Sequence, residues 1–240
     1  MGLHMIDVRA LLFDVVGTVV DWRGGLIARL EAWGAERGIS ADWAGVADAW
    51  RAASPPQWAQ VNAHQRAWAN FDELLLESLE GLLPKFDICG LESAALQTLV
   101  QFWHESPPWP DSVGALQRMR RRYMIAPLSN GHVALLVRMA KAAGLPWDAV
   151  FGADIFQRYK PDPATYLGAA AFLGCEPSDV MLVASHPFDL AFAAKYGLRT
   201  CYVSRPLEYG AGRIVEPPPE KGRFDLMVGD LAELANLMQC

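Results

Sequence analysis

The apolar positions of this chain follow three different spacings along its 240 residues. Residues 11–13 form a short apolar run without an amphipathic period, which is typical of a strand buried on both faces. From residue 26 to about residue 105 the apolar positions recur at helical spacing, and prolines at 55, 56 and 84 punctuate the segment. This pattern predicts four or five helices with no strand among them. Most of the tryptophans fall here and are expected to pack these helices together, with one or two facing a pocket.

The third spacing begins beyond residue 110, where short apolar runs alternate with helical patterns. Strands are predicted at residues 123–128, 147–152, 180–184, 199–203 and 224–228. Helices are predicted at 111–122, with Asp111 as the N-cap, and at 131–143, 163–173, 188–196 and 231–237. Glycines at 144, 174 and 197 mark three helix ends. Strands that alternate with helices of this length predict an α/β fold with a parallel sheet covered on both faces.

Composition narrows the classes of function. The formal net charge is −6, and the basic run at 118–122 falls at the end of a predicted helix, where cations suit the helix dipole. A nucleic-acid partner is therefore not expected. The four cysteines are scattered without a CxxC spacing, so neither a zinc site nor a disulfide framework is expected. No apolar run approaches about 20 residues, and no cationic leader opens the chain. We therefore expect no membrane partner and a cytoplasmic location.

Polar residues stand at the ends of the core strands. Asp14 ends the first strand, Ser-Asn-Gly at 129–131 ends the second, and Asp189 lies just past the strand at 180–184. Lys160 stands in a Tyr-Lys-Pro-Asp segment before a helix. Each residue alone is explained by a helix cap or a solvated loop. Because the carboxyl ends of parallel strands meet at one edge of the sheet, the four together predict an active site there.

The order of these motifs resembles the haloacid dehalogenase superfamily. The matching stretches are Asp-Val-Val-Gly-Thr at 14–18, Ser-Asn-Gly at 129–131, Lys-Pro-Asp at 160–162, and Asp189. The resemblance covers nearly the whole chain. It implies a Rossmann-like parallel-sheet core made of residues 1–22 and 106–240. It also implies that residues 23–105 form an all-helical cap domain inserted after the first motif.

Two positions separate the branches of that superfamily. Its magnesium-dependent phosphatases carry an acid two residues after the nucleophile, and here that residue is Val16, which neither donates a proton nor binds a metal. Their fourth motif begins with an acid, and here that residue is Ser185. Asp14 and Asp189 alone leave a weak magnesium site. The chain therefore resembles the (S)-2-haloacid dehalogenase branch, which works without a metal and implies no cofactor. Two alternatives stay open: a phosphatase of small phosphate monoesters with a degenerate magnesium site, and a non-catalytic binding protein.

The resemblance implies a role for each site residue. Asp14 attacks C2 of a 2-haloacid, such as a haloacetate or 2-halopropionate, and forms an aspartyl ester. Arg51 of the cap faces the halide, and Ser129 holds the substrate carboxylate with the backbone N–H groups that follow it. Lys160 keeps the nucleophile ionised, Thr18 orients it, and Asp189 activates the water that hydrolyses the ester. The implied catalytic residues are Asp14, Thr18, Arg51, Ser129, Lys160 and Asp189. The implied substrate-binding residues are Val15, Val16, Asn130, Tyr166, Ser185, His186 and Phe188.

Some residues depart from the better-known dehalogenases. His186 stands where those enzymes have asparagine, Phe188 where they have tryptophan, and Val16 where an aromatic residue is common. These changes fall in the substrate pocket and leave the preferred haloacid open. We expect His186 to line the site, and His132 is a weaker candidate of the same kind. The implied partners are a small 2-haloacid and a halide ion, and the family suggests a homodimer.

Overall fold

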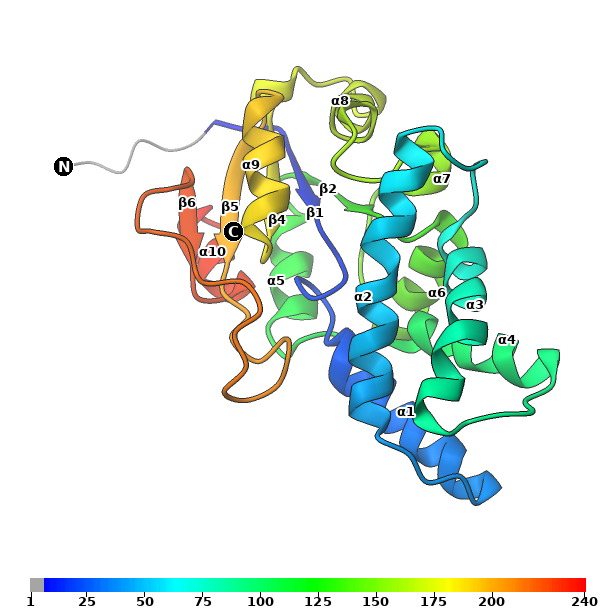
Figure 1. Ribbon diagram of the computed structural model, residues 1–240. Coiled ribbons are helices and arrows are strands. Elements are labelled where there is room, and N and C mark those ends of the chain that lie inside the picture. The colour runs from blue at the N-terminus through cyan, green and yellow to red at the C-terminus, as the bar shows by residue number, and fades with distance from the viewer. Residues whose placement is uncertain (1–6) are drawn as a thin grey trace.

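A parallel sheet lies at the centre of the core in the computed structural model, which describes residues 7–240 (Figure 1). Its strands are β1 (Ala10–Phe13), β2 (Met124–Ser129), β3 (Phe151–Gly152), β4 (Val180–Ala184), β5 (Arg199–Val203) and β6 (Leu226–Val228). They lie in the order β3-β2-β1-β4-β5-β6, and each neighbouring pair is parallel. The chain order reverses between β1 and β4. Ligands of such sheets bind beyond the carboxyl ends of the strands at this reversal.

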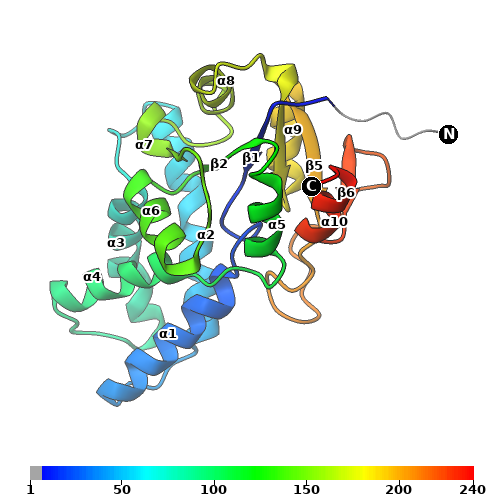
Figure 2. The same cartoon turned by 180° about the vertical axis from the view of Figure 1, so that it is seen from behind.

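Helices cover both faces of the sheet because successive side chains of each strand point to opposite sides. Leu11 and Phe13 pack on the face covered by α5 (Ser112–Met119), α6 (Val133–Ala143) and α10 (Leu231–Leu237), the face turned to the viewer in Figure 2. Ala10 and Leu12 pack on the face covered by α8 (Pro163–Phe172) and α9 (Pro187–Lys195). Each fully buried leucine contributes about 1.5–3 kcal/mol. The predicted α/β fold with a parallel sheet is confirmed.

The segment from Trp22 to Glu105 is helical and lies to one side of the sheet (Figure 1). It contains α1 (Trp22–Arg37), α2 (Trp43–Asn62), α3 (Phe71–Leu82) and α4 (Ser93–Gln101), with the short 3₁₀ helices η1 (Leu83–Phe86) and η2 (Phe102–Glu105). Three buried tryptophans pack these helices together: the rings of Trp22 and Trp50 lie 5.5 and 5.7 Å from that of Trp103. We propose that residues 23–105 act as a cap domain on a core of residues 1–22 and 106–240, of which residues 1–6 lie outside the described part.

The helical segment begins earlier than predicted. Helix α1 starts at Trp22 rather than at residue 26, because the Asp21 side chain accepts a hydrogen bond from Gly24 N at 2.8 Å and caps the helix. Gly24 and Gly25 signal a loop in the sequence, yet both are helical. A Cβ at Gly25 would lie 2.3 Å from Pro107 Cδ. The glycine therefore permits a close approach between helix and loop rather than a turn.

Helix α2 runs through Pro55 and Pro56, so the break predicted there is wrong. A proline has no N–H to donate, and these two leave the carbonyl groups of Arg51 and Ala52 without their usual helical partners. Arg51, Ala52 and Pro55 all line a cavity. The interruption in the hydrogen-bond ladder therefore falls beside the cavity and not at a helix end.

Helix α5 also differs from its prediction. It ends at Met119 rather than at residue 122, and the Asp111 side chain does not cap it. The Asp111 carboxylate instead pairs with the Arg205 guanidinium at 2.8 Å and accepts a hydrogen bond from Leu231 N at 2.7 Å. A partner distant in sequence thus outcompetes the local cap. The helices α7 (Ala153–Phe156) and η3 (Pro177–Asp179) were not predicted. No helix within residues 7–240 is long and apolar enough to cross a membrane.

Candidate active site

Asp14 lies directly after β1, beside the reversal of strand order, and only 7 % of its surface is exposed. Lys160 Nζ donates to its Oδ1 at 2.8 Å, and Thr18 Oγ1 donates to its Oδ2 at 2.8 Å. His186 Nδ1 lies 3.0 Å from the same Oδ2. Lys160 also forms an ion pair with Asp189. The structure therefore brings together Asp14, Thr18, Lys160, His186 and Asp189, which the sequence analysis placed in one site.

The charges around Asp14 decide its ionisation. Burial by itself would raise the pKa of the Asp14 carboxyl, but the charges and hydrogen bonds of Lys160 and His186 outweigh burial and hold that pKa well below its usual range. Burial opposes a charge on Lys160 as well, yet Asp14 and Asp189 raise the pKa of its ammonium group. Both partners are therefore charged at neutral pH, and Asp14 is a buried anion.

Asp189 is held on both of its oxygens. Tyr166 Oη donates to Oδ1 at 2.5 Å, while Lys160 pairs with Oδ2. Burial and then the Asp189 charge raise the pKa of the Tyr166 hydroxyl, so it stays a donor. Tyr166 is fully buried and is not among the residues that line the cavity. Its expected contact with substrate is therefore wrong, and it positions Asp189 instead.

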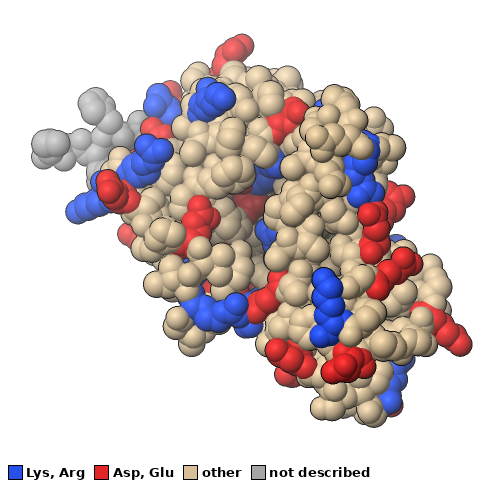
Figure 3. Space-filling view, in the orientation of Figure 1, with Lys and Arg blue, Asp and Glu red and all other residues tan. Residues whose placement is uncertain are grey.

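A cavity of about 810 Å³ opens above Asp14. Figure 3 shows the hollow between the sheet and the helical segment, with charged side chains inside it. Residues of both parts line it, including Trp58 and Phe71 of the helical segment and Lys160 of the core. The predicted residues that line it are Asp14, Val16, Arg51, Ser129, Asn130, Lys160, His186, Phe188 and Asp189.

Arg51 brings an unpaired positive charge to the cavity from helix α2. Its Nε is buried without a hydrogen-bond partner, and its guanidinium lies 5.3 Å from the centre of the Trp58 ring. Among the ion pairs of the described residues, none involves Arg51. A buried N–H group without an acceptor is costly. The geometry therefore suits an anion placed against Arg51.

Besides Tyr166, two further residues predicted to contact the substrate, Val15 and Ser185, do not line the cavity. Val15 is 1 % exposed and packs in the hydrophobic core, whereas its neighbour Val16 lines the cavity. Ser185 does not line the cavity either; its Oγ lies 3.1 Å from Thr18 Oγ1, and its N–H donates to Thr18 Oγ1 at 2.9 Å. Because the Asp14 carboxylate can only accept hydrogen bonds, the Thr18 proton is directed to Asp14 Oδ2.

Ser129 at the end of β2 and Asn130 in the loop after it form hydrogen bonds that fix the backbone around the site. Ser129 Oγ accepts a hydrogen bond from Gly131 N at 3.0 Å. Asn130 Oδ1 accepts from Lys160 N at 2.6 Å, which ties the lysine backbone to this loop. Phe188 lies at the rim of the cavity and is 55 % exposed. These residues line the cavity, and their contacts with a substrate stay predictions.

Glu208 was missed by the sequence analysis. It lies in the loop after β5 and is 5 % exposed. Its Oε1 lies 3.1 Å from His186 Nε2 and accepts a hydrogen bond from Trp22 Nε1 at 3.2 Å. A Cβ at Gly17, where φ is +93°, would lie 2.2 Å from the same oxygen. A glutamate in a loop carries no periodic or motif signal, and only the glycine of the first motif hints at a close neighbour.

The loop that follows Glu208 was also missed. Asp48 of α2 pairs with Arg213 of this loop, and Arg23 Nε donates to Asp48 Oδ1 at 2.7 Å. The same loop brings Tyr209, Val215 and Glu216 to the cavity. It therefore joins the core to the helical segment at the mouth of the cavity.

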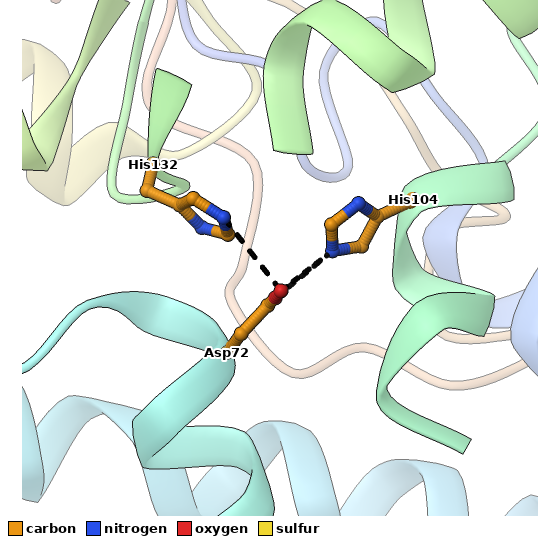
Figure 4. Close-up of side chains that lie close together, drawn as sticks. All are labelled: Asp72, His104 and His132. Atoms are coloured by element: carbon orange, nitrogen blue, oxygen red, sulfur yellow. Dashed lines mark hydrogen bonds and ion pairs between the residues drawn. The ribbon is translucent and has the colours of Figure 1, made fainter. Parts of the chain in front are cut away.

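A second cluster of titratable groups lies at the junction of α3, η2 and the loop after β2 (Figure 4). His104 Nε2 lies 2.9 Å from both carboxylate oxygens of Asp72, and His132 Nε2 lies 3.6 Å from Oδ2. A metal-bound histidine normally donates its other ring N–H to a partner, yet Nδ1 of both His104 and His132 is buried without one. The donor set therefore fits a hydrogen-bonded contact between core and helical segment better than a metal site. His132 belongs to this contact and does not line the cavity, so its expected place is wrong.

The chain is similar to known proteins in both sequence and fold. The model of the haloacid dehalogenase-like hydrolases matches residues 8–197. The chain is 32 % identical to (S)-2-haloacid dehalogenase 4A of Burkholderia cepacia over 216 residues, which covers 85 % of this chain and 88 % of that protein. The crystal structure of the L-2-haloacid dehalogenase PA0810 superposes with a TM-score of 0.92 at 41 % identity, covering 97 % of this chain and 99 % of that one. The defluorinating L-2-haloacid dehalogenase Rha0230 superposes with a TM-score of 0.91 at 39 % identity, covering 97 % and 96 %. The chain therefore belongs to the haloacid dehalogenase-like hydrolases.

Proposed function

We propose that this protein hydrolyses short 2-haloacids to 2-hydroxy acids through an ester on Asp14. The observation that carries the proposal is a pair of opposite charges across one cavity. Asp14 is a buried carboxylate held ionised by Lys160 and His186, and Arg51 is a cation with no acidic partner within residues 7–240. The names of the relatives, which are (S)-2-haloacid dehalogenases, support the same reaction.

In the first step an oxygen of Asp14 attacks C2 of the haloacid. The new C–O bond forms as the carbon–halogen bond breaks, and the halide leaves with the bonding electrons. Arg51 faces the departing halide, whose charge grows as the bond lengthens. The turn between Ser129 and the start of α6 holds the substrate carboxylate, because a helix N-terminus favours anions. Because the attack is in line, the configuration at C2 inverts.

In the second step water attacks the carbonyl carbon of the Asp14 ester. Asp189 takes a proton from this water and returns it to the oxygen that leaves with the product. The product is a 2-hydroxy acid, and Asp14 is a carboxylate again. The net reaction consumes one water and releases one halide ion and one proton.

The donor set at Asp14 supports a reaction without a metal. The Lys160 ammonium group lies between the carboxylates of Asp14 and Asp189, where a cation bound to both would have to sit. Val16 offers no ligand atom, and Thr18 Oγ1 has its proton directed to Asp14. Magnesium prefers carboxylate and water oxygens in an octahedral shell. These residues do not fit such a shell.

Halide release in the presence of EDTA tests the proposal. The purified protein is assayed with fluoro-, chloro- and bromoacetate and with both enantiomers of 2-chloropropionate. We expect halide from the chloro and bromo acids, from the (S) enantiomer only, and none from Asp14→Asn, which lacks the nucleophilic charge. If none of these acids releases halide, the proposal is contradicted.

The same protein is assayed for the two other functions. Magnesium-dependent hydrolysis of a small phosphate monoester would support a phosphatase with a degenerate metal site. A 2-haloacid that stays bound and unchanged, with no adduct on Asp14 by mass spectrometry, would support a binding protein. We also propose a cytoplasmic location, which the four free cysteines fit. The homodimer suggested by the family stays a prediction.

A further inference from the structure

His186 lies between two carboxylates. Its Nδ1 is 3.0 Å from Asp14 Oδ2, and its Nε2 is 3.1 Å from Glu208 Oε1. A carboxylate oxygen accepts hydrogen bonds and cannot donate them, so both ring nitrogens carry a hydrogen. His186 is therefore an imidazolium in this arrangement. Neither nitrogen is free to take a proton from water.

We propose that His186 is a catalytic residue of ester hydrolysis: its Nδ1–H stabilises the negative charge that develops on Asp14 Oδ2 when water attacks. Glu208 is the positioning residue that keeps the ring charged and aimed at that oxygen. This inference rests on the proposed function, in which Asp14 carries the ester.

The two oxygens of Asp14 have different surroundings, which assigns their roles. Oδ1 contacts Lys160, whereas Oδ2 accepts hydrogen bonds from Thr18 and His186. When Oδ1 attacks the substrate, Oδ2 becomes the carbonyl oxygen of the ester. Its two donors lie at 2.8 and 3.0 Å. Donors at about 2.7–3.1 Å are expected of a site that stabilises an oxyanion.

The atoms of the step balance in this arrangement. The water oxygen bonds to Asp14 Cγ, the carbonyl electrons move to Oδ2, and the water proton passes to Asp189. The tetrahedral intermediate then re-forms the carbonyl and breaks the bond between Cγ and Oδ1. Oδ1 leaves with the product and takes that proton back from Asp189, and the second water proton is released when the new Asp14 carboxyl group ionises again. His186 keeps both of its protons throughout.

Glu208 matters most once the ester has formed. Esterification removes the Asp14 charge, and Glu208 is then the contacting carboxylate that remains at the ring. Burial lowers the pKa of His186, but Glu208 and Asp14 together raise it to about 10. The other charged or titratable groups that line this cavity are Lys160, Asp189, Asp48, Tyr209, Glu216 and the arginines Arg51 and Arg213. Of these groups, Tyr209 stays neutral, because burial and then Glu208 raise its pKa to about 12.

Rapid-quench kinetics with 2-chloropropionate separate the two chemical steps. In His186→Leu we expect one equivalent of halide per site at a rate no slower than wild type, followed by hydrolysis slowed about 10²–10³-fold. The Asp14 ester then accumulates and is counted by mass spectrometry of the intact protein. His186→Asn keeps a neutral donor of similar reach, and we expect an intermediate rate of hydrolysis. The amplitude of the halide burst counts the folded sites.

Glu208→Gln tests the positioning role. Glutamine keeps an acceptor for the ring and for Trp22 Nε1 but removes the charge. We expect the rate of ester hydrolysis to decline with rising pH at least about one pH unit earlier than in wild type, while the halide burst keeps its pH dependence. Glu80→Gln, at an exposed position of α3, is the matched control and should behave as wild type.

Three results would overturn this role. The first is a slower burst in His186→Leu with a raised KM and no ester accumulation, which would mean that the ring holds the substrate carboxylate instead. Unchanged hydrolysis in both His186 variants is the second. An unshifted pH dependence in Glu208→Gln is the third. A wild-type protein that releases no halide overturns the proposed function itself, so the two failures are distinguishable.

Discussion

Lys160→Met removes the cation that holds two buried carboxylates together. The Lys160 side chain is 7 % exposed, and those of Asp14 and Asp189 are 10 % and 7 % exposed. Methionine fills a similar volume, so the main change is electrostatic. Each carboxylate loses a charge-assisted hydrogen bond, worth about 1.5–3 kcal/mol. Breaking a buried ion pair by removing one partner costs about 3–5 kcal/mol. We therefore expect the free energy of unfolding to fall by about 3–5 kcal/mol near pH 7.

The pH dependence of this loss has a definite sign. In the wild type the folded-state pKa of Asp14 is lowered, so its contribution to stability is present above the unfolded pKa and is lost as pH falls. In Lys160→Met, burial with one cation fewer raises the pKa of the Asp14 carboxyl relative to wild type. As pH falls, protonation of this carboxylate removes the unpaired buried charge that destabilises the variant. The difference in stability is therefore largest near neutral pH and shrinks in acid.

Urea denaturation followed by circular dichroism at several pH values measures this difference. Lys221→Met is the matched control, because Lys221 is exposed in a loop and its loss should change stability little. A Lys160→Met protein within about 1 kcal/mol of wild type near pH 7 would refute the reasoning, since that is the range of an exposed pair. A difference that grows as pH falls would refute it as well.

Four further predictions concern other contacts of the site and of the Asp72 cluster. Arg51→Gln should slow the halide burst about 10²–10³-fold, because the departing halide loses its cation; an unchanged burst in rapid-quench assays counts against this role. Gly17→Ala should destabilise the protein by about 1–3 kcal/mol in thermal unfolding, because its φ is +93° and its Cβ would meet Glu208; a neutral effect contradicts the described packing. Asp72→Ala should cost about 1.5–3 kcal/mol through the lost bond to His104. EDTA should leave the wild-type unfolding midpoint unchanged, and a fall in that midpoint would indicate a metal in the Asp72 cluster.

The sheet and the centre of the site were predictable because both follow from local pattern and one topological rule. Buried runs identified the strands, and the convergence of parallel strand ends brought Asp14, Lys160 and Asp189 to one place. The direction of side chains at the end of β1 distinguishes Val15 from Val16. Adjacent residues leaving a strand point to opposite sides, so only one of the two could line the cavity, and the structure selects Val16.

Contacts between distant loops were not predictable. Glu208 reaches His186 because the loop after β5 folds back over the site, and no spacing in the sequence encodes that path. His132 follows a strand end, as Asp14 does, but its side chain contacts Asp72 of the helical segment. The partner of a side chain depends on packing between segments, which a single sequence does not reveal.

Isotope labelling of Asp14 tests the central claim most directly. A single turnover of 2-chloropropionate with excess enzyme in ¹⁸O-water is followed by digestion and mass spectrometry of the peptide that contains Asp14. We expect ¹⁸O in the Asp14 carboxylate and ordinary oxygen in the hydroxyl of the product, because water attacks the ester carbonyl carbon. Label in the product hydroxyl with none in Asp14 would mean that water displaces the halide directly, and would contradict the account.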